Sequence, residues 1–175
     1  MTRRNVSLMM VAPNKSTSFI CGMTSAGIEP FFSNYFTKEL AGIQTTFKNK
    51  FLIEVLERLG KNTPEVWESI LTNAGSVKHL EFLTEDEKKR FFTAFEISPK
   101  DMIDLASDRQ EFIDMGQSLN LFHRAKYNLK DVYEIHKYAW NRGIKTLYYY
   151  FNRHSALESS DGNIENWDSC VSCAD

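Results

Sequence analysis

Two short apolar runs, placed at opposite ends of the chain, constrain its fold more than any other feature. NVSLMMVAP ends at Pro13, and IKTLYYYF follows Gly143. Each has the length of a strand and is apolar enough to be covered on both faces, as strands of parallel sheets are. Two strands cannot form a stable sheet with a core of their own. The sequence therefore predicts an α/β chain whose strands need further partners.

The stretch between these runs carries the periodicity and the caps of helices. Apolar residues recur at helical spacing from about Lys50 until Gly60, a residue that favours a helix C-terminus. Thr84 and Glu87 have the spacing of a capping box, which predicts a helix beginning at Thr84. Further helices are expected over 63–75, 98–119 and 128–142. Most of the chain is thus expected to be helical.

The composition is typical of one folded domain with a polar tail. Of 175 residues 42% are hydrophobic, and 13 Phe, 7 Tyr and 3 Trp are present, as in a globular protein. The formal charge of -2 predicts no attraction to nucleic acid or to an anionic membrane, and no run approaches the length of a membrane span. We expect a folded part over 1–153 and a flexible tail over 154–175, which holds five acidic residues and no Lys or Arg.

Cys170 and Cys173 form the only closely spaced cysteine pair, and they lie in that tail. A single C-x-x-C cannot complete a four-ligand zinc site, and no histidine stands at zinc-finger spacing from it, so no metal site is predicted. Two thiols on a flexible tail suit thiol–disulfide exchange, because one thiolate attacks a disulfide and the other resolves the mixed intermediate. The alternative is an incidental pair in a disordered terminus. Cys21, between Ile20 and Gly22, is expected to be buried and inert.

The segment PNKSTS follows the first apolar run and is chemically suited to hold a phosphate. It offers successive backbone N–H groups, three hydroxyls and a lysine in a predicted loop. It does not match a P-loop, and the alternative is an ordinary turn, since Ser and Thr favour turns. The candidate phosphate-binding residues are Asn14, Lys15, Ser16, Thr17 and Ser18.

Tyr148 and Tyr149 lie in the second apolar run, within LYYYF. On a regular strand their side chains would point to opposite faces. Aromatic residues in a strand most often pack in a core, and this is the plain interpretation of the pair.

Four segments, taken in order, resemble the C-terminal part of the large, catalytic subunit of class I aerobic ribonucleotide reductase. They are APNKSTS with GIEP, GQSLN, GIKTLYY and the terminal cysteine pair, and the resemblance covers essentially the whole chain. In that family the subunit is a ten-stranded α/β barrel, which would explain two strands without a sheet. The resemblance implies reduction of ribonucleoside diphosphates to deoxyribonucleotides in the cytoplasm, or in the host cytoplasm if the chain is encoded by a phage.

The resemblance also implies a role for each candidate residue. Residues 14–18 would cradle the substrate diphosphate. Tyr148 and Tyr149 match the pair that passes a radical from the metal cofactor of a small subunit to the catalytic cysteine. Such tyrosines are normally stacked, so a plain strand geometry would count against this role. Cys170 and Cys173 match the tail dithiol that reduces the active-site disulfide and is itself re-reduced by thioredoxin or glutaredoxin.

Two departures from the family pattern bear on these expectations. Lys15 stands where many relatives carry an acidic or neutral residue. The radical-bearing cysteine, the cysteines of the active-site disulfide and the effector sites belong to an earlier part of such a subunit, and none can be placed here. The start at Met1 suggests a subunit encoded in two pieces, or a truncated chain.

The expected partners are therefore the rest of the large subunit and a small radical-generating subunit, with no cofactor bound by this chain directly. The alternative is a helical interaction module without catalysis, whose tail reacts with thioredoxin.

Overall fold

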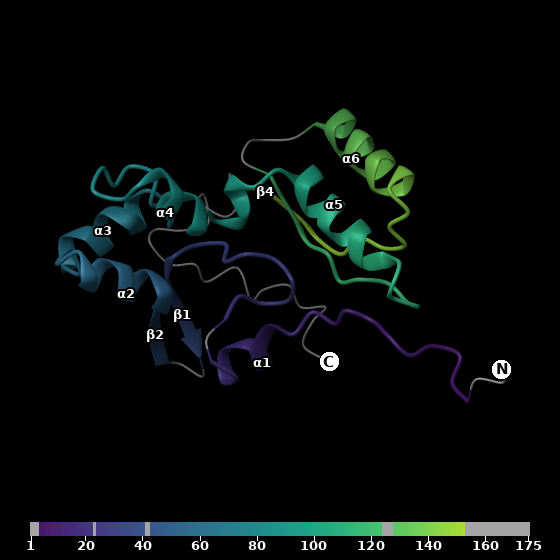
Figure 1. Ribbon diagram of the computed structural model, residues 1–175, viewed down its shortest axis with the longest axis horizontal. Helices are drawn as coiled ribbons and strands as arrows, with labels where there is room; N and C mark the ends of the chain where they lie inside the picture. Colours follow the sequence, from purple (N-terminus) through teal and green to yellow (C-terminus); the bar gives the residue numbers. More distant parts are fainter. Residues whose placement is uncertain (1–3, 23, 41–42, 124–127, 153–175) are drawn as a thin grey trace. The chain divides into compact units, whose positions relative to one another are not determined.

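The computed structural model describes residues 4–22, 24–40, 43–123 and 128–152, and Figure 1 shows how they fold. The chain divides into two compact units. The first unit takes Met1–Pro30 and Ile97–Asn152, and the second unit includes Phe31–Glu96. The elements, in chain order, are α1 (Lys15–Ile20), β1 (Tyr35–Leu40), β2 (Ile43–Lys48), α2 (Lys50–Arg58), α3 (Pro64–Thr72), α4 (Glu85–Arg90), the 3-10 helix η1 (Ala94–Glu96), α5 (Pro99–Gln110), β3 (Leu121–His123), α6 (Leu129–Asn141) and β4 (Tyr150–Asn152).

The second unit begins with a β-hairpin that the sequence analysis did not predict. β1 and β2 pair antiparallel, with Tyr35 opposite Lys48 and Phe36 opposite Phe47. The rings of Phe36 and Phe47 stack with their centroids 5.2 Å apart, and both side chains are buried. The aromatic and β-branched residues of these strands favour a β-sheet.

The helices of the second unit begin and end where local signals predict. The Asn49 side chain accepts a hydrogen bond from the Phe51 N–H at the start of α2, and Gly60 adopts a φ of 64° after its end. Both bonds of the capping box between Thr84 and Glu87 are present at the start of α4. These helices and the loops between them bury one core, formed by Leu52, Leu56, Trp67, Ile70, Val77, Leu80, Leu83 and Phe91.

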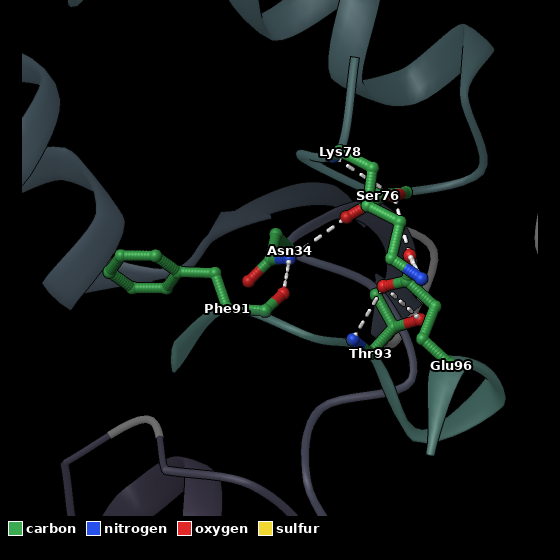
Figure 2. A network of polar contacts seen from close by, with 7 residues as sticks. Asn34, Ser76, Lys78, Phe91, Thr93 and Glu96 are labelled. Atoms are coloured by element: carbon green, nitrogen blue, oxygen red, sulfur yellow. Dashed lines mark hydrogen bonds and ion pairs between the residues drawn. The ribbon is translucent and has the colours of Figure 1, made fainter. Parts of the chain in front are cut away.

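A buried asparagine joins three segments of the second unit, as Figure 2 shows. The Asn34 side-chain amide donates to the carbonyls of Gly75, at 2.9 Å, and Phe91, at 2.8 Å. Its Oδ1 accepts a hydrogen bond from the Asn49 side chain at 2.8 Å. Because each of these groups is taken from water, the fully paired amide stabilises the arrangement.

A buried carboxylate closes the other half of this polar network (Figure 2). Glu96 accepts hydrogen bonds from the Thr93 backbone N–H at 2.8 Å and from the Ser76 hydroxyl at 2.7 Å. The Lys78 ammonium lies 3.4 Å away. Burial of Glu96 favours the neutral form, but the hydrogen bonds and the lysine charge outweigh it and lower the pKa of this carboxyl. Glu96 is therefore a satisfied structural group.

The first unit packs α5 and α6 beside a short parallel pair of strands. β3 and β4 pair with Leu121 opposite Tyr150, and Figure 1 shows α6 alongside α5. Asn128 and Asp131 form a complete capping box at the start of α6, and Gly143 has a φ of 75° beyond its end, so the prediction for 128–142 is confirmed. The core of this unit consists of Met102, Ile103, Ala106, Leu119, Leu121, Ile135, Ala139 and Ile144.

The helix predicted over 98–119 ends earlier, at Gln110. The Gln110 side chain donates to the carbonyls of Ile113 and Met115 and so holds the following residues in a turn. Gly116 then allows a close approach, because a Cβ at this position would lie 2.4 Å from the Thr146 hydroxyl oxygen. Residues 111–120 thus connect the end of α5 to the start of β3 and run beside the segment that leads to β4.

The buried strand predicted over residues 5–13 is wrong in most of its length. Val11 alone forms a parallel bridge, with Gln117, and Leu8, Met9 and Met10 are each more than half exposed. An apolar side chain is buried only where neighbouring residues cover it, and the described residues provide no sheet at this segment.

The strand predicted over 144–151 is likewise shorter than expected. Within the described residues it is limited to β4, and the residues from Ile144 to Tyr149 are not assigned to a strand. Tyr148 and Tyr149 therefore lie just before β4 begins.

Candidate functional site

Tyr148 and Tyr149 form a side-by-side aromatic pair. Their ring centroids are 4.2 Å apart and their planes are inclined by 52°. Tyr148 is 44% exposed, and Tyr149 is half-buried. Consecutive residues of a regular strand point in opposite directions, so this geometry differs from the strand expected for the segment. The two rings are in contact, but they are tilted and not stacked as the resemblance implies for relay tyrosines.

The backbone of the pair is fixed by residues just before and within β3. The Tyr148 N–H donates to the Leu119 carbonyl at 2.9 Å, and the Leu121 N–H donates to the Tyr149 carbonyl at 2.9 Å. The Tyr149 N–H donates instead to a side chain, the Oδ1 of Asn120, at 3.3 Å. Three successive residues, 119–121, thus hold two successive tyrosines.

A buried carboxylate supports this segment from the other part of the first unit. Glu29 is only 3% exposed, and its Oε1 accepts a hydrogen bond of 2.6 Å from the Asn120 N–H. Burial raises the pKa of the Glu29 carboxyl, and hydrogen bonds from Asn120 and from the backbone at residues 28 and 29 oppose that rise. Gly27, with a φ of 67°, leaves room for this group, since a Cβ there would lie 2.8 Å from the Glu29 Oε2.

The predicted phosphate loop is a short helix in the structure. Asn14 occupies the N-cap position of α1, which then runs over six residues, and its side chain makes no capping hydrogen bond. Asn14 and Thr17 are exposed, whereas Ser18 is buried. The side chains of Lys15 and Ser16 lie outside what the structure describes. Because the next residues bond back to Asn14 and Thr17, the turn predicted from the Ser and Thr content continues as a helix.

Cys21 is exposed, so the prediction of a buried thiol is wrong. It follows the last residue of α1, and the neighbouring Ile20 is 85% exposed. Apolar neighbours in sequence do not bury a thiol unless other parts of the fold cover it. Cys170 and Cys173 lie outside the described residues.

The described residues show neither a candidate metal site nor a candidate membrane span. They contain no group of three or more His, Cys, Asp or Glu side chains that could hold a metal ion. None of the helices described is long and apolar enough to cross a membrane.

Asn120 and Glu29 are the site residues that sequence reasoning missed. Both lie in segments that carry the family resemblance, GQSLN and GIEP, but no role follows from the letters alone. Their positions in the chain are 91 residues apart, and only the fold brings them within hydrogen-bond distance.

Comparison with known proteins identifies the family. The family model of the ribonucleotide reductase barrel domain matches residues 2–150. The ribonucleoside-diphosphate reductase large subunit of Invertebrate iridescent virus 6 is 42% identical over 151 residues, which cover 84% of this chain and 16% of the viral protein. The ribonucleoside-diphosphate reductase subunit alpha of Chlamydia muridarum is 38% identical over 146 residues, covering 83% of this chain and 14% of the relative.

A solved structure agrees with these sequence matches. The class Id ribonucleotide reductase alpha subunit of Actinobacillus ureae superposes with a TM-score of 0.76 and 43% sequence identity, over 86% of this chain and 27% of that chain. The chain thus belongs to the ribonucleotide reductase barrel-domain family, which confirms both the resemblance and the α/β barrel expected from it. It spans between 14% and 27% of the length of these three relatives.

Proposed function

We propose that this chain supplies three parts of a ribonucleoside-diphosphate reductase: a site for the substrate diphosphate, a pair of radical-relay tyrosines and a reducing tail dithiol. The diphosphate would contact Asn14, Lys15, Ser16, Thr17 and Ser18. Tyr148 and Tyr149 would carry the radical that originates at the metal cofactor of a small subunit. Cys170 and Cys173 would reduce the active-site disulfide and then be reduced by thioredoxin or glutaredoxin.

The contact between the two tyrosine rings is the observation that carries this proposal. A core function would need only burial, yet Tyr148 is 44% exposed and its ring lies 4.2 Å from that of Tyr149. Two phenol groups held in contact, one of them reaching the surface, suit transfer of an oxidising equivalent between a partner and the interior. Membership in the reductase barrel-domain family supports this role over simple packing.

The start of α1 supports the assignment of residues 14–18 to the diphosphate. The first N–H groups of a helix have no partner within the helix and carry partial positive charge, so they favour an anion. Asn14 and Thr17 are exposed there and can reach a ligand. The lysine at position 15 adds a positive charge of the correct sign.

The chemistry requires residues that this chain does not contain. Hydrogen abstraction from the ribose needs a thiyl radical, and reduction of the sugar needs two further thiols beside it. The sequence has three cysteines in all, and the tail pair is already assigned to re-reduction, so only Cys21, close to the proposed phosphate segment, is left for these three thiols. We therefore propose that the rest of a large subunit and a small radical-generating subunit complete the active site. The exposed apolar residues Val6, Leu8, Met9 and Met10 support a partner surface at this segment.

Removal of two hydroxyls at the start of α1 tests the phosphate assignment. The double change Ser16→Ala with Thr17→Ala is expected to weaken diphosphate binding by about 1–3 kcal/mol for each charge-assisted hydrogen bond lost. Calorimetric titration of the assembled reductase with a ribonucleoside diphosphate and with the corresponding nucleoside measures this loss, which should be confined to the diphosphate.

Thr24→Ala with Ser25→Ala is the matched control, because it removes the same two hydroxyl types just beyond α1. Equal diphosphate affinity in the wild type and in the variant at positions 16 and 17 would show that this segment is an ordinary helix start that does not bind the diphosphate.

A further inference from the structure

The pairing of β3 with the segment before β4 contains an irregularity at the two tyrosines. In a regular parallel pair, the residue whose carbonyl accepts from Leu121 also donates its N–H to the carbonyl two residues earlier, at Leu119. Tyr149 accepts from Leu121, but the Leu119 carbonyl is taken by the N–H of Tyr148. Two successive tyrosines thus occupy a place where a regular ladder has one residue.

The extra residue is accommodated by the side chain of Asn120. The Tyr149 N–H, displaced from the Leu119 carbonyl, donates to the Asn120 Oδ1 at 3.3 Å. An extra residue of this kind is a β-bulge, which ends the strict alternation of side chains and redirects them. Tyr148 and Tyr149, the two residues at this place, have their ring centroids 4.2 Å apart.

Asn120 is itself held on two sides. Its backbone N–H donates to the Glu29 Oε1 at 2.6 Å, and its side chain helps to lower the pKa of the Glu29 carboxyl against the effect of burial. An amide side chain has a donor and an acceptor at its two ends. The acceptor end of Asn120 meets the N–H of Tyr149, and the bond from its backbone N–H to Glu29 fixes the residue that carries this side chain.

The molecule maintains this support at a cost in stability. Glu29 is 3% exposed, and an ionised carboxylate loses hydration when it is buried, even where hydrogen bonds replace part of it. Gly27 also suits this place, because its φ of 67° is one that L side chains rarely adopt and a Cβ there would lie 2.8 Å from the Glu29 Oε2. Costly polar arrangements of this kind are found where a local geometry matters for function.

We propose that Asn120 is a positioning residue for the tyrosine pair, holding the bulge that brings Tyr148 against Tyr149, and that Glu29 orients Asn120. The consequence for turnover rests on the proposed function of the tyrosines. The consequence for ring geometry does not, and the two can be measured separately.

The geometric part is tested on the full chain with 3-fluorotyrosine at position 148. Its ¹⁹F chemical shift is compared with that of the same label in a Tyr149→Leu background, so that the difference reports the contact between the rings. The Asn120→Ala variant is expected to lose this difference. Gln117→Ala is the control, because it removes another buried amide of the first unit, whose side chain bonds α5 residues, and it should keep the difference.

Two substitutions that change charge, at Asn120 and Glu29, distinguish an effect on the orientation of the Asn120 side chain from a simple loss of packing. Asn120→Asp keeps an acceptor for Tyr149 but places a second carboxylate against Glu29, so the ring contact should again be lost. Adding Glu29→Gln restores a donor opposite the new carboxylate, and the double variant should recover the shift difference. Recovery in a variant with two changes cannot come from damage to the fold. A double variant that stays like Asn120→Asp, or an Asn120→Ala variant that keeps the difference, would overturn the inference.

The functional part is measured in the assembled reductase. Asn120→Ala should lower kcat by about 10²-fold, the scale expected when a reacting group is misplaced by about 1 Å, and should leave the affinity for the diphosphate substrate unchanged. If the ring contact is lost and kcat stays at the wild-type level, the positioning role stands and the radical-relay function of the tyrosines fails. An unchanged ring contact contradicts the positioning role whatever the turnover.

Discussion

Replacing Tyr148 or Tyr149 with phenylalanine is expected to abolish multiple turnover of the assembled reductase while the chain stays folded. Phenylalanine keeps the ring and almost all of the volume, so the loss of stability should stay below about 1.5 kcal/mol. It lacks the O–H group whose proton and electron leave when a tyrosyl radical forms. Melting temperature and steady-state turnover, measured on the same preparations, separate the two effects.

Tyr133→Phe provides the matched control for this experiment. Tyr133 lies on α6 in the same unit and is 60% exposed, so the same O–H is removed from an exposed tyrosine outside the pair. Turnover of this variant should equal that of the wild type. Near-normal turnover of Tyr148→Phe and Tyr149→Phe would show that the pair only packs, and the relay would have to be abandoned.

Replacing Cys170 or Cys173 with serine should remove turnover that is driven by thioredoxin or glutaredoxin. In the proposed exchange the tail dithiol gives two electrons and two protons to the active-site disulfide and becomes a disulfide itself, which needs both sulfur atoms. A small dithiol that enters the site directly should restore much of the activity in either variant. Turnover with each reductant, measured side by side, therefore identifies the step that is lost.

Ser172→Ala is the control in the tail, because it changes a residue between the two cysteines without removing a thiol. It should behave as the wild type with every reductant. If the double variant Cys170→Ser with Cys173→Ser still turns over with thioredoxin at the wild-type rate, the dithiol has no part in re-reduction.

Helix boundaries could be predicted from the sequence where the signal is local. The capping boxes at Thr84 and Asn128 and the glycines at positions 60 and 143 act within one turn of the chain. Their effect on the backbone hardly depends on what packs around them, so reading the letters in order is sufficient.

The strands could not be placed in the same way, because a strand is defined by its neighbour. The apolar run ending at Pro13 has the composition of a buried strand, yet among the described residues only Val11 forms a bridge, and Leu8, Met9 and Met10 stay more than half exposed. The hairpin of β1 and β2 was missed for the opposite reason. Its strands carry charged and polar residues such as Lys38 and Gln44. They are therefore not apolar runs, which is the pattern from which the other strands were predicted.

The candidate site was predictable by its residue types and not by its geometry. The tyrosines could be singled out in the sequence, but the spacing of a regular strand predicts that they point apart. Their contact depends on Asn120, which depends on Glu29, 91 residues away in the chain. Such a chain of contacts is set by the tertiary fold, so no local pattern could have indicated it.

Reconstitution is the most direct test of whether this chain completes a reductase. Formation of deoxyribonucleotide is measured with the chain alone, with a polypeptide that carries the rest of the barrel, and with that polypeptide plus a small radical-generating subunit. We expect activity only in the last mixture, because the tail pair is assigned to re-reduction and leaves only Cys21 where the chemistry needs a thiyl radical and two further thiols beside the sugar. Reduction of ribonucleotides by a purified monomer of this chain would contradict the account, and a stable monomer that binds neither partner would favour a non-catalytic interaction module.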